Sequence, residues 1–401
     1  MGGYHRNFYL ICGLAFCYFF AFDAFDSVLA LYGKELGQSA FFIGSVLGVG
    51  NALRMVLAVP MGHLGDAYGR KWFALGILLV LGAALLGLSA VTRPVAVFAL
   101  ALVVVVSRTP FNVMLNPMLA YAVSSEQRGR AFGVRDVFLY GGSTAGVCLA
   151  GLWVVYGYRA LFLVLGCLIL LAVPLALGLR DARERRKEQR EAEAEASASR
   201  EKKSWRAAFA ELRRHRVVTV FAVVLFLCSL AGGSLMLVAL KGQRIGIPVD
   251  AILYTVAGSN LLAVLLSYLG GRMTDAFDRR LLFMGSLAVT MTFYLSLCVA
   301  QSYIGFAVAM LLQAVMLVFA PVLSVYFFEF FPEEIAGKAF GVMTTFGLIG
   351  ESFSTLLAGA LWEGAAWPEL AFAVAAVLVG LALVVTVVWV PRTYVPLRAR
   401  R

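Results

Sequence analysis

Long apolar runs separated by short polar segments run the length of the chain. A helix needs about 20 mostly apolar residues to cross a bilayer, and twelve runs are long enough. They are roughly 8–31, 40–61, 72–91, 95–123, 131–155, 158–179, 217–240, 251–271, 281–301, 303–331, 337–362 and 367–390. They are far too long for the strands of a membrane barrel and lack the alternation of such strands. The pattern therefore predicts an all-α membrane protein with twelve transmembrane helices.

One long polar segment divides these spans into two sets of six. Residues 180–216 contain 13 Lys and Arg and 8 Asp and Glu. Within it, Trp205, Phe209 and Leu212 are spaced i, i+4, i+7 beside basic residues, which predicts a helix lying on the membrane surface. A flexible linker without membrane contact is the alternative. We expect an N-terminal six-helix bundle (1–179), a charged cytoplasmic linker (180–216) and a C-terminal six-helix bundle (217–401).

Composition and charge agree with a membrane protein. Hydrophobic residues make up 61% of the chain and charged residues 14%, whereas soluble domains have about 45–50% and about 25%. With the N-terminus in the cytoplasm, 27 Lys and Arg fall in cytoplasmic segments and five in outer loops. The net charge of +11 therefore reflects the positive-inside rule, and no nucleic-acid partner is expected. The prediction is a multi-pass protein of the cell (inner or plasma) membrane, with both termini cytoplasmic.

Two loop motifs occur twice, once in each half. The stretch from Gly62 to Lys71 recurs as Gly271 to Arg280, with Asp66 and Asp275 209 residues apart. The stretch 126–133 recurs as 334–341, offset by 208 residues. Two motifs with almost one offset indicate a duplication of six helices, and transporters commonly hold their substrate between such repeats.

These residues carry a family resemblance. The stretch Gly62, Gly65, Asp66, Gly69, Arg70 and Lys71 resembles the loop 2–3 signature of the major facilitator superfamily, G-x-L-x-D-x-x-G-R-[KR]. Arg108 in the fourth span and the Phe-Phe-Pro sequence at 330–332 resemble further features of that family. The resemblance covers essentially the whole chain. It implies a secondary transporter with alternating access and a small-molecule substrate, and we expect a monomer surrounded by membrane lipid.

The loop motif also has a physical reading of its own. Its glycines permit a tight turn and close helix approach, and Asp66 can accept hydrogen bonds from a helix N-terminus. In the family that partner is usually helix 11, which would begin near Gly337. Arg70 could pair with Glu126. We therefore predict a conformational latch, meaning contacts that hold one conformation, formed by Gly62, Gly65, Asp66, Gly69, Arg70, Lys71, Glu126, Asp275 and Arg279. The alternative is that Asp66 and Arg70 only cap a short loop.

Ionisable residues inside the spans are candidates for function, because charge is costly in a bilayer. Asp23 and Asp26 share one face of the first span, and two close carboxylates do not both ionise easily. One is therefore expected to carry a proton near neutral pH. The predicted proton-coupling set is Asp26, Asp23, Arg108 and Glu351. A permanent structural pair between an aspartate and Arg108 is the alternative.

The predicted substrate contacts are Arg54, Asn112, Asn116, Asn260, Gln313 and Tyr326. Hydrogen bonds between helices are an equally good explanation for the uncharged members of this set. The positions 208 residues after Asp26, Arg54 and Arg108 are Ser234, Leu262 and Met316. The N-terminal half is therefore expected to couple to the ion.

Acids in helix 1 with an arginine in helix 4 resemble the proton-coupled drug exporters of the superfamily. Helix 5 departs from them: Gly141, Gly142, Gly146 and Gly151 partly keep the antiporter glycine spacing, but its proline is missing. A proton-coupled exporter of small amphipathic molecules is the first hypothesis. The alternatives are a proton symporter or uniporter of an organic anion or sugar-like solute and, more remotely, a membrane receptor or scaffold.

No enzymatic role is expected, because the loops carry no phosphate-binding motif, metal cluster or nucleophile–base pair. The six cysteines lie in apolar runs without a CxxC pair, so they are predicted to be small buried hydrophobic residues with no metal site. No cofactor is expected, and a proton gradient would supply the energy.

Overall fold

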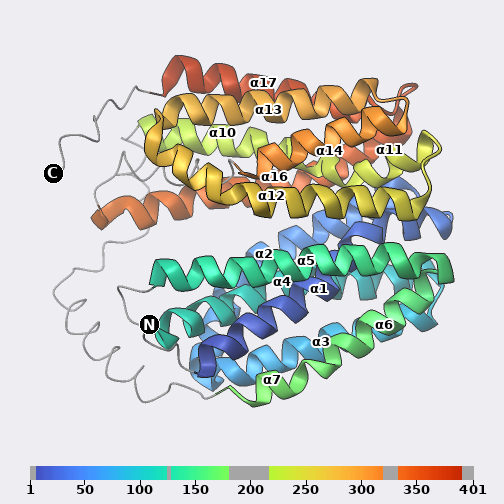
Figure 1. The fold of residues 1–401 in the computed structure, drawn as a ribbon, viewed down its shortest axis with the longest axis vertical. Helices are drawn as coiled ribbons and strands as arrows, with labels where there is room; N and C mark the ends of the chain where they lie inside the picture. The colour runs from blue at the N-terminus through green and yellow to red at the C-terminus, as the bar shows by residue number, and fades with distance from the viewer. Residues whose placement is uncertain (1–5, 124–127, 180–215, 319–332, 391–401) are drawn as a thin grey trace. The chain divides into compact units, whose positions relative to one another are not determined.

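The computed structural model describes residues 6–123, 128–179, 216–318 and 333–390, and within these ranges helices joined by short turns and loops make up the structure, without a strand (Figure 1). The first half contains α1 (Arg6–Glu35), α2 (Ala40–Tyr68), α3 (Arg70–Ala90), α4 (Pro94–Ala122), α5 (Arg128–Trp153), the 3-10 turn η2 (Val154–Tyr156), α6 (Tyr158–Leu171) and α7 (Val173–Leu177). The second half contains α10 (Arg216–Gly232), the 3-10 turn η3 (Gly233–Leu237), α11 (Val238–Arg244), α12 (Val249–Ala276), α13 (Arg279–Val299), α14 (Tyr303–Val318), α16 (Glu333–Gly364) and α17 (Leu370–Trp389).

The helical segments are long and apolar enough to make this a multi-pass membrane protein. Within the described ranges, ten segments meet the length and hydropathy of a membrane span. A shorter apolar helix at Tyr303–Met316 and the 32-residue α16 occupy the positions predicted for spans ten and eleven. The predicted all-α membrane fold is confirmed.

The chain divides into two compact units. Unit 1 is Met1–Gln38 with Val49–Trp205, and unit 2 is Ser39–Gly48 with Arg206–Arg401. The predicted linker, 180–216, lies outside the described residues except for Arg216, where α10 begins.

Four helix pairings recur in both units, as the predicted duplication requires. In unit 1, α1 packs on α5 and α6, and α3 packs on α4 and α6. In unit 2, α10 packs on α16 and α17, and α13 packs on α14 and α17. Figure 1 shows α13 and α17 side by side, as it does α3 and α6.

Glycines allow the closest of these contacts. A side chain at Gly142 or Gly146 of α5 would overlap the carbonyls of Phe16 and Phe20 in α1. In unit 2, a Cβ at Gly350 of α16 would lie 2.8 Å from the carbonyl oxygen of Phe226 in α10. Membrane helices associate largely through van der Waals packing at small residues, because the hydrophobic effect contributes little to the contact between two helices in lipid. Gly142 and Gly146 of α5 and Gly350 of α16 thus have a packing role.

A basic side chain at one helix start contacts the end of another helix in both units. Lys71 Nζ donates to the Leu177 carbonyl oxygen at 2.6 Å, which joins the start of α3 to the end of α7. Arg280 Nη2 donates to the Val387 carbonyl oxygen at 2.7 Å, which joins the start of α13 to the end of α17. Arg280 is 209 residues after Lys71, so the contact is repeated with the fold.

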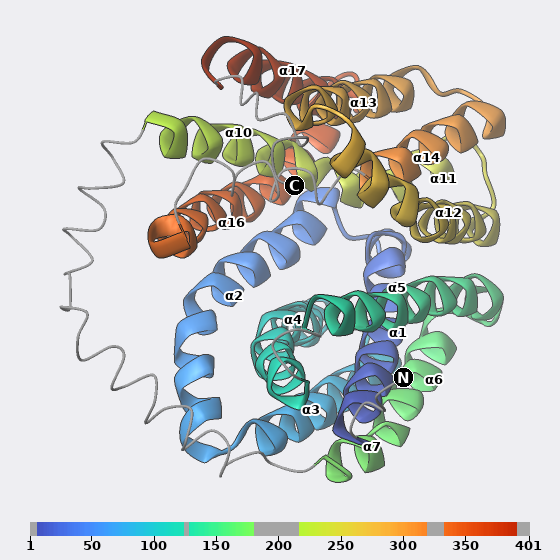
Figure 2. The same cartoon turned by 60° about the vertical axis from the view of Figure 1, so that its left-hand side comes forward.

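Three features differ from the sequence-based expectation. The second span continues as helix to Tyr68, because Gly62 and Gly65 do not break it, and the turn is confined to Gly69. The sixth span is interrupted at Ala172, before Pro174, and the seventh contains the 3-10 turn η3. Figure 2 shows that α2 is curved, and Pro60 inside it removes one helical hydrogen bond and permits the bend.

Candidate functional site: a cluster of charges in unit 1

Asp23 and Asp26 lie in the third quarter of α1, inside a membrane span. Ser143 of α5 is a polar neighbour of Asp23, and Arg108 and Asp26 are its charged neighbours. The charged neighbours of Asp26 are Arg108 and Arg54. The side chain of Asp23 is half-buried, and the side chain of Asp26 is exposed. Both acids therefore lie in the electrostatic field of the arginine on α4.

Arg108 is supported by aromatic rings of α1. Its guanidinium carbon lies 5.3 Å from the ring centre of Phe22 and 5.9 Å from that of Phe19. A cation over an aromatic face is stabilised by about 0.5–2 kcal/mol, more when water is excluded. This support holds the charge of Arg108 beside α1 without neutralising it.

The contact between α1 and α4 is fixed next to Arg108. The buried Tyr18 hydroxyl hydrogen-bonds to Ser107 Oγ at 2.7 Å, and the Tyr18 ring stacks on Phe111 with 3.7 Å between centroids. Ser107 Oγ also reaches the Val104 carbonyl oxygen at 2.7 Å. Buried polar atoms that are satisfied in this way stiffen their surroundings.

Arg54 of α2 is held by two neutral side chains. Its Nη1 donates to Asn51 Oδ1 at 2.6 Å, and its Nε donates to Thr109 Oγ1 of α4 at 3.0 Å. These hydrogen bonds fix the direction of the guanidinium while leaving its charge uncompensated by them. Unit 1 thus brings together two acids and two arginines from α1, α2 and α4, all within membrane spans.

The remaining predicted coupling and substrate residues lie elsewhere on the spans. Asn112 and Asn116 are half-buried on α4, and Asn112 follows Arg108 by one turn, on the same face. In unit 2, Glu351 lies on α16 beside Gly350, Asn260 on α12 and Gln313 on α14. Gln313 Oε1 is buried without a hydrogen-bond partner in the described part of the chain. Tyr326 lies outside the described residues.

The predicted latch residues surround the turn between α2 and α3. Gly69 adopts φ 99°, a conformation that side chains rarely tolerate, and a side chain at Gly65 would overlap Met114 of α4. Arg70 is buried, with 8% of its surface exposed, Lys71 contacts α7, and Arg279 begins α13. Glu126 lies outside the described residues, as do the side chains of Asp66 and Asp275, and the surroundings of Gly62 are not described either. The pairing of Arg70 with Glu126 stays a prediction.

Sequence reasoning missed a buried ion pair in unit 2. Lys241, which the sequence places in an outer loop, lies in α11 with no exposed surface, and its Nζ is 2.9 Å from Glu369 Oε1. Arg244 Nη1 lies 3.6 Å from the other carboxylate oxygen. Glu369 precedes α17, and 128 residues separate it from Lys241, so no local signal in the sequence reveals the pair.

The pKa of Glu369 shows which effect dominates at this pair. Burial alone would raise the pKa of this carboxyl. The hydrogen bonds from Lys241 and the backbone, together with the positive charges of Lys241 and Arg244, outweigh burial and lower the pKa below its ordinary value of 4.5. Glu369 is therefore ionised, and the pair joins α11 to the start of α17.

The cysteines are less uniformly buried than the sequence suggests. Cys12 and Cys298 are buried, Cys17, Cys148 and Cys228 are half-buried, and Cys167 of α6 is exposed. The side chain of Cys167 belongs to a membrane span, so lipid can cover it there.

The fold is that of a multi-pass membrane transporter. A family model described as Major Facilitator Superfamily matches residues 11–259 and 222–401, and the chain belongs to this superfamily. The family resemblance stated from the loop motif is thereby confirmed.

Three relatives and two solved structures illustrate the range of similar proteins. The multidrug resistance protein MdtG of Erwinia billingiae is 26% identical over 151 residues, and that of Escherichia fergusonii 28% over 148 residues, with 36% of each chain covered. The chain thus matches about a third of the length of these relatives. The MFS-type transporter MJ1560 of Methanocaldococcus jannaschii is 22% identical, with 74% of this chain and 75% of the relative covered. The nucleoside transporter NupG (TM-score 0.77; 95% of this chain and 99% of that one) and a D-xylose-proton symporter (0.74; 96% and 99%) share the fold at 14% identity.

Proposed function

We propose that this transporter is a proton-coupled exporter of small amphipathic molecules that works by alternating access. The observation that carries the proposal is the group of two acids and two arginines inside the spans of unit 1. Ionisable groups within a bilayer are costly, and such groups in transporters mark ion and substrate pathways. A purely structural pair would need only one acid and one arginine.

The arrangement lets protonation change the balance of charge around Arg108. With Asp26 ionised, its charge offsets those of Arg54 and Arg108. When Asp26 takes up a proton, both arginines lose this counter-charge and become available to other anionic or polar groups. Asp23 retains Ser143 and Arg108 as neighbours, so we assign the coupled proton to Asp26.

The direction of transport is supported by sequence similarity. The first relatives named above are multidrug resistance proteins, but the similarity spans only about a third of each chain. Export of amphipathic molecules is therefore the first hypothesis rather than a property of the fold.

A symporter or uniporter of an organic anion or sugar-like solute is the second candidate. Arg54 favours it, because its hydrogen bonds to Asn51 and Thr109 present a fixed cation to a carboxylate. Counterflow of labelled organic anions and of labelled amphipathic cations in vesicles separates the two candidates.

We further propose that both termini are cytoplasmic in the cell membrane, on the basis of the Lys and Arg distribution. In a protein whose native cysteines are replaced by alanine, Tyr156→Cys should react with an impermeant thiol reagent from outside. Ser197→Cys should react only from the cytoplasmic side. The reverse pattern would overturn the orientation.

The test of coupling is Asp26→Asn in reconstituted vesicles with an imposed pH gradient. Asparagine mimics permanent protonation, so concentrative transport should disappear while exchange at equal pH persists. Asp23→Asn is the matched control and should act more weakly. Full proton-driven accumulation by Asp26→Asn would exclude Asp26 as the proton carrier.

A further inference from the structure

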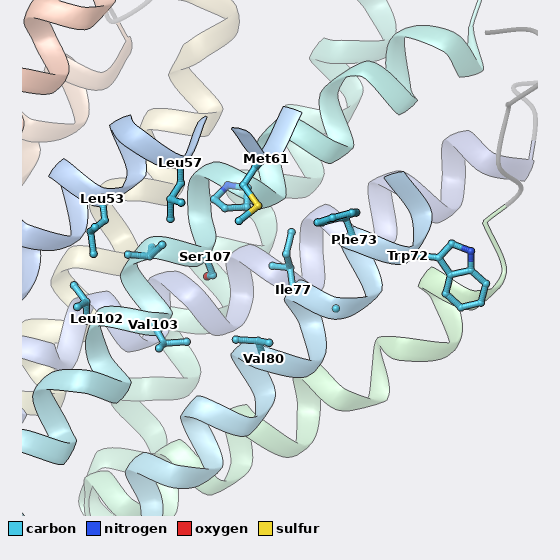
Figure 3. Close-up of a pocket in the computed structure, with 13 residues that line it drawn as sticks. Leu53, Leu57, Met61, Trp72, Phe73, Ile77, Val80, Leu102, Val103 and Ser107 are labelled. Atoms are coloured by element: carbon cyan, nitrogen blue, oxygen red, sulfur yellow. The ribbon is translucent and has the colours of Figure 1, made fainter. Parts of the chain in front are cut away.

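A groove with a volume of about 590 Å³ lies between α2, α3 and α4 of unit 1 (Figure 3). Its walls include Leu53 and Leu57 of α2, Ile77 and Val80 of α3, and Leu102 and Val103 of α4. The hydroxyl of Ser107, on the floor, already bonds to Tyr18 and the Val104 carbonyl oxygen. The groove therefore offers apolar contact and little hydrogen bonding.

The groove runs from a helix end into the membrane span. Trp72 is at the start of α3, and Val80 lies about 12 Å deeper, at about 1.5 Å of helix rise per residue. The hydrocarbon core of a bilayer is about 30 Å thick, so one leaflet contributes about 15 Å. The side chains of both residues are more than half exposed, at 56% and 53%, so the groove opens sideways. Its depth thus matches one leaflet of a bilayer.

A positive charge lies at the interfacial end of the groove. Lys71 Nζ is 5.6 Å from the ring centre of Trp72, which lines the groove. The contact with the Leu177 carbonyl uses one of its three donors. Tryptophan and lysine at a helix end are typical of the headgroup level of a bilayer.

The face of α4 that lines the groove is opposite the face that carries Arg108. Leu102, Val106 and Pro110 line it at i, i+4 and i+8 of α4. Arg108 and Asn112 are each two residues further along, which is about 200° around a helix with 3.6 residues per turn. An occupant of the groove is therefore separated from the coupling acids by the body of α4.

We propose that this groove binds an acidic phospholipid, with one acyl chain along α3 and the phosphate at the Lys71 ammonium. The apolar walls match the chain, the one-leaflet depth matches a lipid rather than a spanning ligand, and the basic end matches a phosphate. Basic sites next to apolar clefts between membrane helices bind acidic headgroups. The proposal does not depend on the direction of transport or on its coupling to protons.

The groove can be filled without disturbing the packing. Gly76 lines it, and a Cβ added at Gly76 meets no atom within 4 Å, so Gly76→Leu places a side chain into the space of the acyl chain. Gly285 of α13 lies 209 residues later, and a Cβ there also meets open space. Gly285→Leu is therefore the matched control in the other repeat.

The headgroup is tested with a second pair of variants. Lys71→Gln removes the charge, and Lys71→Arg retains it. Arg280→Gln removes the equivalent charge and carbonyl contact in unit 2 and serves as the control. Size-exclusion chromatography and circular dichroism establish that each variant is folded.

The measurement is native mass spectrometry of the full chain, purified in neutral detergent, with equal amounts of palmitoyl-oleoyl phosphatidylglycerol and phosphatidylcholine. The wild type and both controls should retain phosphatidylglycerol about fivefold better, which corresponds to about 1 kcal/mol per lysine at an anionic surface. Gly76→Leu should lose bound lipid of both kinds. Lys71→Gln should lose only the preference, and Lys71→Arg should keep it.

Two outcomes would overturn the proposal. Equal retention of phosphatidylglycerol by the wild type, Gly76→Leu and Lys71→Gln would place lipid binding elsewhere. Unchanged lipid binding by Gly76→Leu with reduced transport of an amphipathic substrate would assign the groove to the substrate. The Asp26→Asn test does not measure the amount of bound lipid or the preference for phosphatidylglycerol. The proposal of proton coupling and the proposal of lipid binding can therefore fail separately.

Discussion

The two halves share four helix pairings but place their charges differently. In unit 1, Asp23, Asp26, Arg54 and Arg108 lie well inside the spans. In unit 2, Glu351 is the one Asp, Glu, Lys or Arg near the middle of a long helix within the described residues, and Lys241 and Glu369 pair at the ends of two spans. A charge near the interface needs only one good partner, whereas a charge at mid-membrane depth must be compensated entirely by the protein. The same scaffold therefore has a buried ion pair at the ends of its spans in one copy and a group of two acids and two arginines inside its spans in the other.

The largest expected difference between the halves is in transport. Arg108→Gln should abolish proton-driven accumulation in vesicles, because both α1 acids lose their common counter-charge. The equivalent change in the second repeat, Met316→Gln, alters a position that carries no charge and should leave most of the accumulation. Equal losses in the two variants would show that the asymmetry has no bearing on coupling.

The next largest effect is on the stability of unit 2. Lys241→Met or Glu369→Gln should each lower the free energy of unfolding by about 3–5 kcal/mol, because one partner of a buried pair is left uncompensated. The double variant Lys241→Met/Glu369→Leu should recover most of this loss. Denaturant titration followed by tryptophan fluorescence in micelles measures all three, and additive losses would contradict a coupled pair.

A smaller difference is expected between the two units when a glycine at a helix crossing is replaced by alanine and the loss of stability is measured. Gly142→Ala directs a methyl group into the Phe16 carbonyl and should cost about 3 kcal/mol. Its counterpart Gly350→Ala has 2.8 Å to the Phe226 carbonyl oxygen and should cost about 1–2 kcal/mol. Gly141→Ala, whose nearest atom is 3.9 Å away, is the control. Equal stability of all three variants would contradict the close packing of α1 on α5.

The smallest expected effect is the pH dependence of the stability that Glu369 contributes to unit 2. Since the pKa of Glu369 is lowered in the folded protein, its ionised form stabilises unit 2 fully above the ordinary value of 4.5. This stabilisation is lost as the pH falls through the lower, folded-state value. The difference in stability between the wild type and Glu369→Gln should therefore shrink as the pH is lowered below 4.5. A constant difference would show that Glu369 does not titrate in this window.

Much of the fold can be predicted from hydropathy and repetition, because each span must satisfy its backbone internally. The interruptions at Ala172 and Gly233 carry no hydropathy signal, since apolar residues continue through both. The end of α2 was predicted seven residues too early because Gly62 and Gly65 suggested a loop. In a membrane helix, close packing explains such glycines equally well.

The site was only partly predictable. Charged residues in apolar runs identified Asp23, Asp26, Arg54 and Arg108 as candidates. Their supporting side chains, Ser143, Asn51 and Thr109, are ordinary polar residues whose importance depends on contacts between helices. The pairing of Lys241 with Glu369 depends on tertiary structure in the same way.

The contacts Lys71–Leu177 and Arg280–Val387 also have a consequence for biosynthesis. Each closes a six-helix bundle by joining its third helix to the end of its sixth. At about 5–20 residues per second, the ribosome takes about 10–40 s to travel from the first of these carbonyls to the second. The nascent first half can close during this interval, with its two acids and two arginines already side by side. The costliest charges of the chain can therefore be sheltered before the second half leaves the ribosome.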